Sequence, residues 1–196
     1  MYRVTHSLLE SWRRATSSDA ADNSMPEFLE TLRRVPKPQT DAMLRGIEFE
    51  AEITDIVVHG GRVRKGVEDT AILNFAKKVA GSTPQVRVER KAVVRNKPLL
   101  LVGVADFVRA GVIFDTKRVS RYEYGKYIDS TQHPMYFELF PEARRFDYLI
   151  YDGKYAYTET YRPCDCAPIS ETIYKFLDFM DNTGLMQTYE KYWEER

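Results

Sequence analysis

The sequence predicts a single α/β domain in which a mixed β-sheet is flanked by helices. Helical patterns occupy about the first 80 residues, and runs rich in β-branched and aromatic residues, separated by turn signals, follow them. The chain of 196 residues suits one hydrophobic core and is too short for a second full domain. We therefore expect one domain over 1–196, with a helical amino-terminal segment (about 1–80) and a helical carboxy-terminal tail (about 170–196).

The amino-terminal segment is expected to contain four helices. Ser24 and Glu27 have the spacing of a capping box, in which two side chains bond each other's backbone amides at a helix start. Gly81 is a stop signal for the last of the four. The expected helices span 5–16, 25–34, 41–58 and 67–80.

Turn signals divide the rest of the chain. Ala110-Gly111 and Asp152-Gly153 are predicted turns between strands. Pro134 fits a helix only within its first turn, so that helix is expected to begin at Ser130 or Thr131. The expected elements are strands at 85–95, 98–109, 112–117, 145–151 and 155–161, a helix at 131–141, and helices from 170 to the end, interrupted at 182–184. The aromatic residues of the last helix, Tyr189, Tyr192 and Trp193, could pack on the core or on a partner subunit.

Two acidic residues and a lysine lie on consecutive predicted strands. Asp106 interrupts an apolar run, and Asp115-Thr116-Lys117 ends the next strand. Alternate residues of a strand share a face, so Asp115 and Lys117 point the same way, and the intervening turn brings Asp106 near Asp115. Two buried carboxylates side by side need a cation, and oxygen ligands suit Mg²⁺ or Mn²⁺. Lys117, as an ammonium, would orient a water or stabilise charge on a phosphate. The set predicts metal-dependent phosphodiester hydrolysis.

An interpretation without catalysis remains open for the Asp115-Thr116-Lys117 triplet. An Asp-x-Lys triplet is common by chance, and the chain contains a second one, Asp152-Gly153-Lys154, which lies at a hairpin turn and is interpreted as structural. The alternative for the first copy is a surface ion pair between Asp115 and Lys117 on an edge strand.

Four segments, in the expected order, resemble motifs of the RecB-like branch of the PD-(D/E)xK nuclease superfamily. The resemblance spans Gly46 to Tyr136 and implies a restriction-endonuclease-like core. The four segments are Gly46 to Glu50, Asp106, Asp115-Thr116-Lys117, and Gln132 to Tyr136.

The resemblance implies a Mg²⁺-dependent DNA exonuclease of recombination, repair or phage DNA metabolism, with Mn²⁺ able to substitute. It implies that Glu50, Asp106 and Asp115 bind the metal together with the backbone carbonyl of Thr116, and that Lys117 assists the water. It also implies that Gln132 and Tyr136 position DNA. The implied catalytic residues are Glu50, Asp106, Asp115 and Lys117.

Several of these assignments have competitors in the sequence. Glu48 lies about 160° around the helix from Glu50, so only one of them can face the metal; Gly46 is expected to permit close approach beneath Glu50. Tyr136 could equally be a core aromatic. His133 could be a proton shuttle, although a helix-start histidine is more often exposed.

Basic residues are spread unevenly in a chain of zero net charge. Arg118 and Arg121 lie in a segment that interleaves cations with tyrosines, the mixture that binds single-stranded nucleic acid through phosphates and stacked bases; a solvated loop is the alternative. Further candidate phosphate contacts are Arg62, Arg64 and Lys65 in a loop, and Arg87, Arg90, Lys91, Arg95 and Lys97 on the strand and turn before Asp106.

Cysteine content and hydropathy limit the remaining classes. Cys164 and Cys166 are too close for an ordinary disulfide and too few for a zinc site or an iron–sulfur cluster. No apolar run suits a membrane span or a signal peptide, which favours the cytoplasm. The expected partners are DNA and a second copy or a recombination or replication protein, with no membrane. A non-catalytic nucleic-acid-binding or complex-forming protein on the same scaffold is the alternative function.

Overall fold

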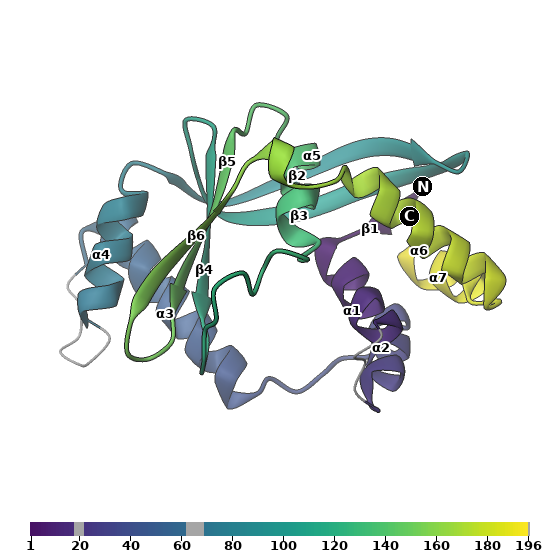
Figure 1. The fold of residues 1–196 in the computed structure, drawn as a ribbon, viewed down its shortest axis with the longest axis horizontal. Helices are drawn as coiled ribbons and strands as arrows, with labels where there is room; N and C mark the ends of the chain where they lie inside the picture. Colours follow the sequence, from purple (N-terminus) through teal and green to yellow (C-terminus); the bar gives the residue numbers. More distant parts are fainter. Residues whose placement is uncertain (18–21, 62–68, 196) are drawn as a thin grey trace.

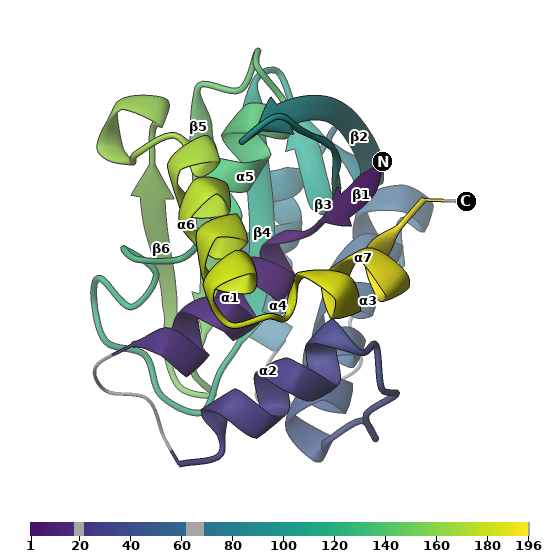
Figure 2. The same cartoon turned by 90° about the vertical axis from the view of Figure 1, so that its right-hand side faces the viewer.

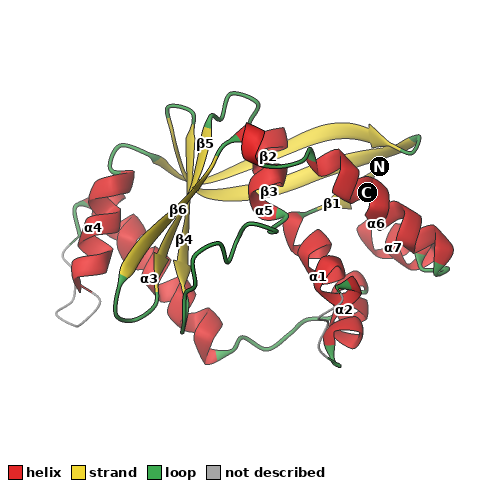
Figure 3. Ribbon diagram, viewed as in Figure 1, coloured by secondary structure: helices red, strands yellow, loops and turns green. Residues whose placement is uncertain are grey.

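The computed structural model describes residues 1–17, 22–61 and 69–195. Within these ranges, six strands form one mixed sheet with helices packed on both sides (Figures 1 and 3). The α/β class with a mixed, helix-flanked sheet is therefore confirmed. The strands are β1 (Tyr2–Val4), β2 (Thr83–Val94), β3 (Lys97–Arg109), β4 (Val112–Arg118), β5 (Arg145–Tyr151) and β6 (Ala156–Tyr161). The helices are α1 (His6–Thr16), α2 (Ser24–Leu32), α3 (Asp41–His59), α4 (Asp69–Val79), α5 (Gln132–Leu139), α6 (Ile169–Asn182) and α7 (Met186–Trp193), with a 3₁₀ turn at Pro163–Asp165.

The central strand β3 changes its neighbour along its length. The strand order is β1-β3-β4-β5-β6, and β2 runs along the other edge of β3. β1 pairs with β3 in parallel as far as Leu101, whereas the antiparallel pairing with β4 begins at Phe107. The stretch of β3 between Leu101 and Phe107 therefore faces a fork in the sheet. Asp106 lies at this fork, and Asp115 lies directly beyond the last β3–β4 pair.

Side chains take over hydrogen bonding where the strands diverge. The Tyr136 hydroxyl of α5 donates to the carbonyl of Val104, and the Thr116 amide donates to the Asp106 carboxylate. Gly103 makes room for α5: a Cβ there would lie 2.6 Å from Leu139 Cδ1 and 3.3 Å from the Tyr136 ring. The missing side chain thus lets α5 pack directly on the open part of β3.

Two hydrophobic cores hold the helices against the sheet. In the smaller core, α3 and α4 pack through Phe49, Ile53 and Phe75 on side chains of the sheet such as Phe107 and Phe114. The larger core unites α1, α2, α5, α6 and α7 with side chains of β1, β3, β4, β5 and β6. Figure 2 shows α1 and α6 crossing in front of the sheet while α3 lies behind it.

Two of the three aromatic residues of the carboxy-terminal tail, Tyr189 and Trp193, pack on the chain's own core, whereas Tyr192 is exposed. Tyr189 is fully buried, and its hydroxyl donates to Arg3 O at 3.0 Å. Trp193 Nε1 donates to Leu32 O at 2.9 Å. The break between α6 and α7 lies where it was expected, and Gly184 adopts a left-handed φ of 71° there.

Two expectations about the amino-terminal half need correction. The segment is not purely helical, because it also contains strand β1. With three residues, β1 is too short to show the alternating pattern typical of a strand. The capping box is wrong: the N-cap of α2 is Asn23, so Ser24 already lies inside the helix. The helix expected at 67–80 is described from Asp69 to Val79, and its first two expected residues lie outside the described ranges. Among the described residues, no helix is both long and apolar enough to cross a membrane.

Replacing Gly103 with alanine is expected to destabilise the fold by about 1–2 kcal/mol, because the new methyl group would overpack against Leu139 and Tyr136. Urea denaturation measures this change. Gly46→Ala is the matched control, since a Cβ at Gly46 would meet nothing within 4 Å; alanine there should stabilise α3 by up to about 1 kcal/mol. Equal stability of Gly103→Ala and wild type would contradict the packing role of Gly103.

Candidate active site

Asp106 is held in place by Thr116 of β4, the strand that diverges from β3 at the fork. Its Oδ2 accepts hydrogen bonds from Thr116 N at 2.8 Å and Thr116 Oγ1 at 3.1 Å. Burial raises the pKa of Asp106 well above its usual value, and the charges of Asp115 and Glu50 add to the rise, against the opposing effects of Lys117 and the Thr116 amide. Asp106 is thus a carboxylate that the surroundings disfavour in its charged form.

Asp115 is buried between a cation and an amide. Lys117 Nζ lies 2.6 Å from its Oδ2, and Gln132 Nε2 donates to its Oδ1 at 2.5 Å. Asp115 is only 5% exposed, and β4 lies between β3 and β5. The alternative of a surface ion pair on an edge strand is therefore wrong: the ion pair exists, but in the interior of the sheet.

Glu50, and not Glu48, faces the acidic residues. α3 carries Glu50 to the side chain of Gln85 on β2, whose amide donates to it. Burial and the charge of Asp115 raise the pKa of Glu50, while Lys117 opposes the rise. Glu48 points to solvent. The sheet does not approach Gly46, because a Cβ there would meet nothing within 4 Å; close approach of a substrate at Gly46 stays a prediction.

Lys117 remains an ammonium in this site. Burial lowers its pKa, but the charges of Asp115 and Asp106 outweigh burial and raise the pKa overall. Its Nζ also lies 5.9 Å from the centre of the Tyr148 ring. A lysine held in this state can donate hydrogen bonds and balance negative charge, but it does not accept a proton at neutral pH.

The donor set fits a divalent cation in its chemistry. The charge of Asp115 raises the pKa of both Glu50 and Asp106, and the ammonium of Lys117 opposes this rise. Carboxylate oxygens are the ligands that Mg²⁺ and Mn²⁺ prefer. Among the described residues, however, no three His, Cys, Asp or Glu side chains already converge as a metal-ligand group. Here Asp106 is turned to Thr116, and Asp115 to Lys117 and Gln132.

The residues of the fourth motif lie in the interior. α5 begins at Gln132 after Thr131, with Pro134 in its first turn as expected. Gln132 is 6% exposed and contacts Asp115, and Tyr136 is buried against β3. The expectation of an exposed His133 is wrong: its ring is fully buried and stacks on Tyr161 at 4.0 Å, and burial lowers its pKa to about 4. Contact of Gln132 and Tyr136 with DNA stays a prediction.

His6 is a site residue that the sequence did not reveal. It begins α1, lies 6.1 Å from Tyr136 between ring centres, and accepts a hydrogen bond on its carbonyl from Thr131 Oγ1 at 3.0 Å. Burial, reinforced by the charge of Lys117 and opposed by that of Asp115, lowers the pKa of His6 to about 4. No periodicity links position 6 with the strand at 112–118, so only the tertiary contact of α1 with α5 could identify it.

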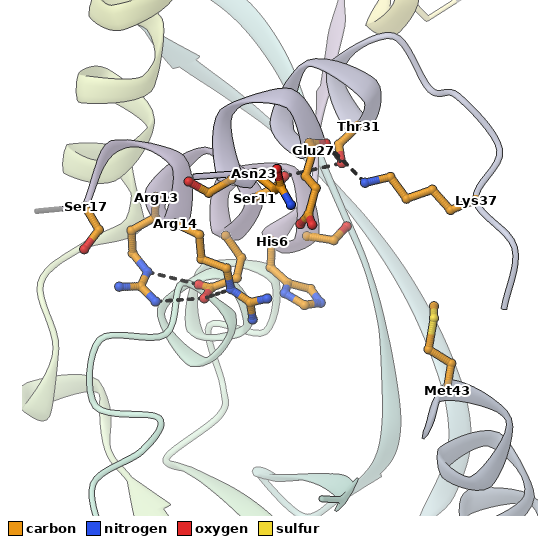
Figure 4. Close-up of a pocket in the computed structure, with 13 residues that line it drawn as sticks. His6, Ser11, Arg13, Arg14, Ser17, Asn23, Glu27, Thr31, Lys37 and Met43 are labelled. Carbon is orange, nitrogen blue, oxygen red and sulfur yellow. Dashed lines mark hydrogen bonds and ion pairs between the residues drawn. The ribbon is translucent and has the colours of Figure 1, made fainter. Parts of the chain in front are cut away.

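A polar groove of about 730 Å³ begins at His6 and lies between α1, α2 and the start of α3. Arg13 and Arg14 lie side by side (Figure 4). Both pair with Glu10, at 2.8 and 3.1 Å. Lys37 also lines the groove, and its ammonium donates to Glu27 O at 3.2 Å. The groove therefore offers cations and hydrogen-bonding groups. Its link to the acidic site is His6, since Glu50, Asp106 and Asp115 do not line it.

Other predicted phosphate contacts are engaged within the protein. Arg118 lies 5.0 Å from the centre of the Tyr151 ring and donates to Val119 O; Arg121 is exposed and pairs with Glu123 at 2.6 Å. Four cations of the hairpin formed by β2 and β3 form ion pairs with nearby acids: Arg87 with Glu89, Arg90 with Glu138, Arg95 with Asp178 and Asp181, and Lys97 with Glu190. The predicted loop contacts Arg62, Arg64 and Lys65 lie outside the described residues.

The second Asp-x-Lys triplet forms the structural turn that was expected. Asp152 Oδ1 accepts the amides of Lys154 at 2.9 Å and Tyr155 at 2.7 Å, which closes the connection between β5 and β6. These amides hold the pKa of Asp152 below its usual value, and burial opposes them. This triplet provides a matched control for the one at the fork.

Comparison with known proteins supports the fold without assigning an activity. No family model and no curated protein matches the sequence. Among solved structures, the one titled "Crystal structure of SSO0001" is similar over 92% of this chain and 77% of that chain, with a TM-score of 0.52 and 14% sequence identity. At this identity the likeness concerns the fold alone.

Replacing Asp106 with asparagine is expected to stabilise the fold at neutral pH. A raised folded-state pKa contributes stability that is present below the unfolded value of about 4 and is lost as pH rises through the folded value. Asparagine avoids that loss and still accepts the bonds from Thr116. Urea denaturation without divalent ions, from pH 4 to 8, should therefore show an advantage that grows with pH.

Asp152→Asn is the control with the opposite sign, because the pKa of Asp152 is lowered. An Asp106→Asn variant less stable than wild type at pH 7 would contradict the raised pKa.

Proposed function

We propose that this chain is a metal-dependent deoxyribonuclease with a restriction-endonuclease-like core, related to the RecB-like branch of the PD-(D/E)xK superfamily. The observation that carries the proposal is that Asp106 of β3 and Asp115 of β4 lie at the fork of the sheet, with Lys117 paired to Asp115, while the charge of Glu50 on α3 is near enough to raise the pKa of Asp106. The order of the motif-like segments along the sequence agrees with it.

The acidic residues would hold Mg²⁺, or Mn²⁺ in its place, with the Thr116 carbonyl as a further ligand. Bound there, the metal lowers the pKa of a coordinated water and neutralises phosphate charge. The protein's own contribution is placement, because Thr116 fixes Asp106 and Gln132 fixes Asp115.

Lys117 would donate a hydrogen bond to the attacking water or to the phosphate. Its raised pKa keeps it protonated, so it acts through charge and orientation. Tyr136 supports the site by bonding Val104 on β3. Gln132 and Tyr136 would also position DNA, although both side chains are buried in this structure.

Nucleic acid would approach along the groove that begins at His6. Arg13, Arg14 and Lys37 are the cations of this groove. Arg118 at the end of β4 and Arg121 on the segment after it supply further positive charge. The action we propose is exonucleolytic, in recombination, repair or phage DNA metabolism in the cytoplasm, with DNA and a second copy or a replication or recombination protein as partners.

A second candidate is a nucleic-acid-binding protein without catalysis. The observation that favours it is that Asp115 is already neutralised by Lys117 and that no ready-made three-ligand group exists among the described residues. Metal-stimulated cleavage distinguishes the two candidates.

Asp115→Asn and Lys117→Ala are each expected to lower Mg²⁺-dependent DNA cleavage by about 100-fold or more, because each removes charge at the reacting phosphate. Asp152→Asn and Lys154→Ala, the matched changes in the structural triplet, should leave cleavage unchanged. Cleavage of end-labelled DNA with Mg²⁺, Mn²⁺ or EDTA measures both pairs. Salt-sensitive DNA binding by folded wild-type protein, without cleavage under any metal condition, would favour the binding protein.

Closed circular DNA is expected to resist cleavage while linear DNA is degraded, because an exonuclease requires an end. Single- and double-stranded forms of both substrates, incubated with Mg²⁺ and resolved on denaturing gels, test this. Cutting of circles at the rate of linear DNA would replace exonuclease by endonuclease action and leave the metal-dependent chemistry intact.

A further inference from the structure

Asp115, Tyr148 and Glu159 form a row across three neighbouring strands. In the register of the sheet, Asp115 of β4 lies opposite Tyr148 of β5, and Tyr148 lies opposite Glu159 of β6. Residues in register point to the same face of a sheet, and neighbouring strands are about 4.8 Å apart. Glu159 therefore lies two strands away from Asp115, about 10 Å along the row.

Glu159 is a buried carboxylate that the proposed chemistry does not use. It is 4% exposed and accepts three hydrogen bonds: from Tyr122 OH at 2.6 Å, from Tyr127 N at 3.2 Å and from Tyr161 OH. Burial of a carboxylate is unfavourable unless donors surround it. Tyr122 and Tyr127 belong to the segment 119–131, which connects β4 to α5, whereas Tyr161 belongs to β6 itself.

The same segment crosses the row and ends at the acidic site. The Tyr127 ring stacks on Tyr148 with centres 4.4 Å apart, and the Tyr122 ring lies 4.6 Å from that of Tyr157. At its end, Thr131 bonds the carbonyl of His6, and the next residue, Gln132, donates to Asp115. The place of Gln132 therefore depends on how firmly the segment is held.

We propose that Glu159 is a positioning residue for the acidic site. By binding Tyr122 and Tyr127, it holds the segment 119–131 against β6 and so keeps Gln132 on Asp115. It also fixes the base from which Tyr124, which is 91% exposed, is presented to solvent between Arg121 and Lys126. The consequence for cleavage rests on the proposed function; the anchoring itself does not.

Two tyrosines that bind the same carboxylate provide a matched pair for the test. Tyr122→Phe removes a bond between Glu159 and the segment, whereas Tyr161→Phe removes a bond within β6 and leaves the segment attached. Hydrogen exchange followed by mass spectrometry reports the peptides that cover 119–131. We expect exchange there to rise about fivefold in Tyr122→Phe, the effect of losing one hydrogen bond, and to stay at the wild-type level in Tyr161→Phe.

Glu159→Gln keeps the side-chain shape and weakens the acceptor, so it should reproduce the effect of Tyr122→Phe. Equal exchange in 119–131 for Tyr122→Phe and Tyr161→Phe would overturn the proposal, as would a uniform rise over the whole chain, which marks a general loss of stability.

Cleavage measured on the same variants separates this inference from the proposed function. Where wild type cleaves DNA, Tyr122→Phe should lower kcat/KM about fivefold and Tyr161→Phe should not. Unchanged kcat/KM in a variant with raised exchange would overturn the positioning role while leaving the nuclease standing. Absence of cleavage by wild type itself refutes the proposed function, and the exchange result then still decides whether Glu159 anchors the segment.

Discussion

The rest of the site depends on the Asp106 carboxylate, which accepts a backbone hydrogen bond that a neighbouring strand would otherwise accept. Along its length, β3 pairs first with β1 and then with β4. Between these two pairings, its backbone groups need hydrogen-bond partners from outside the β-ladder. Asp106 supplies one by accepting the amide of Thr116, and Tyr136 supplies another by donating to Val104. The fork can stay open because these side chains supply hydrogen bonds to its backbone groups. Asp106 and Asp115 lie at this open fork.

The acidic residues near the fork lower the stability of the fold, although the proposed chemistry needs them. Burial and like charges disfavour ionised Asp106 and Glu50, so a protein selected only for stability would have no reason to collect them around Lys117. Strain of this electrostatic kind is typical of functional sites. The surrounding anchors are correspondingly strong: two hydrophobic cores hold the sheet from both sides, and the tail with Tyr189 and Trp193 closes the larger one.

Much of the fold and part of the site could be predicted from local pattern. The two-residue period of strands placed Asp115 and Lys117 on one face, and the Ala110-Gly111 turn, with both φ angles positive, brought Asp106 beside them. Partners from distant segments could not be predicted in this way. β1 is three residues long and makes sense only against β3, and the contact of Gln132 with Asp115 depends on a connection whose path Glu159 sets on another strand.

The sequence by itself determined where most of the helices and the strands after β1 lie, and that acids and a lysine occur on adjacent strands, because periodicity and turn chemistry act over a few residues. The tertiary structure alone decided that Glu50 faces the acids while Glu48 faces solvent, that His6 borders the site, and that Asp115 is buried and bonded to Gln132. Such choices depend on packing between elements far apart in the chain, where burial and charge fix orientations that a local pattern leaves free.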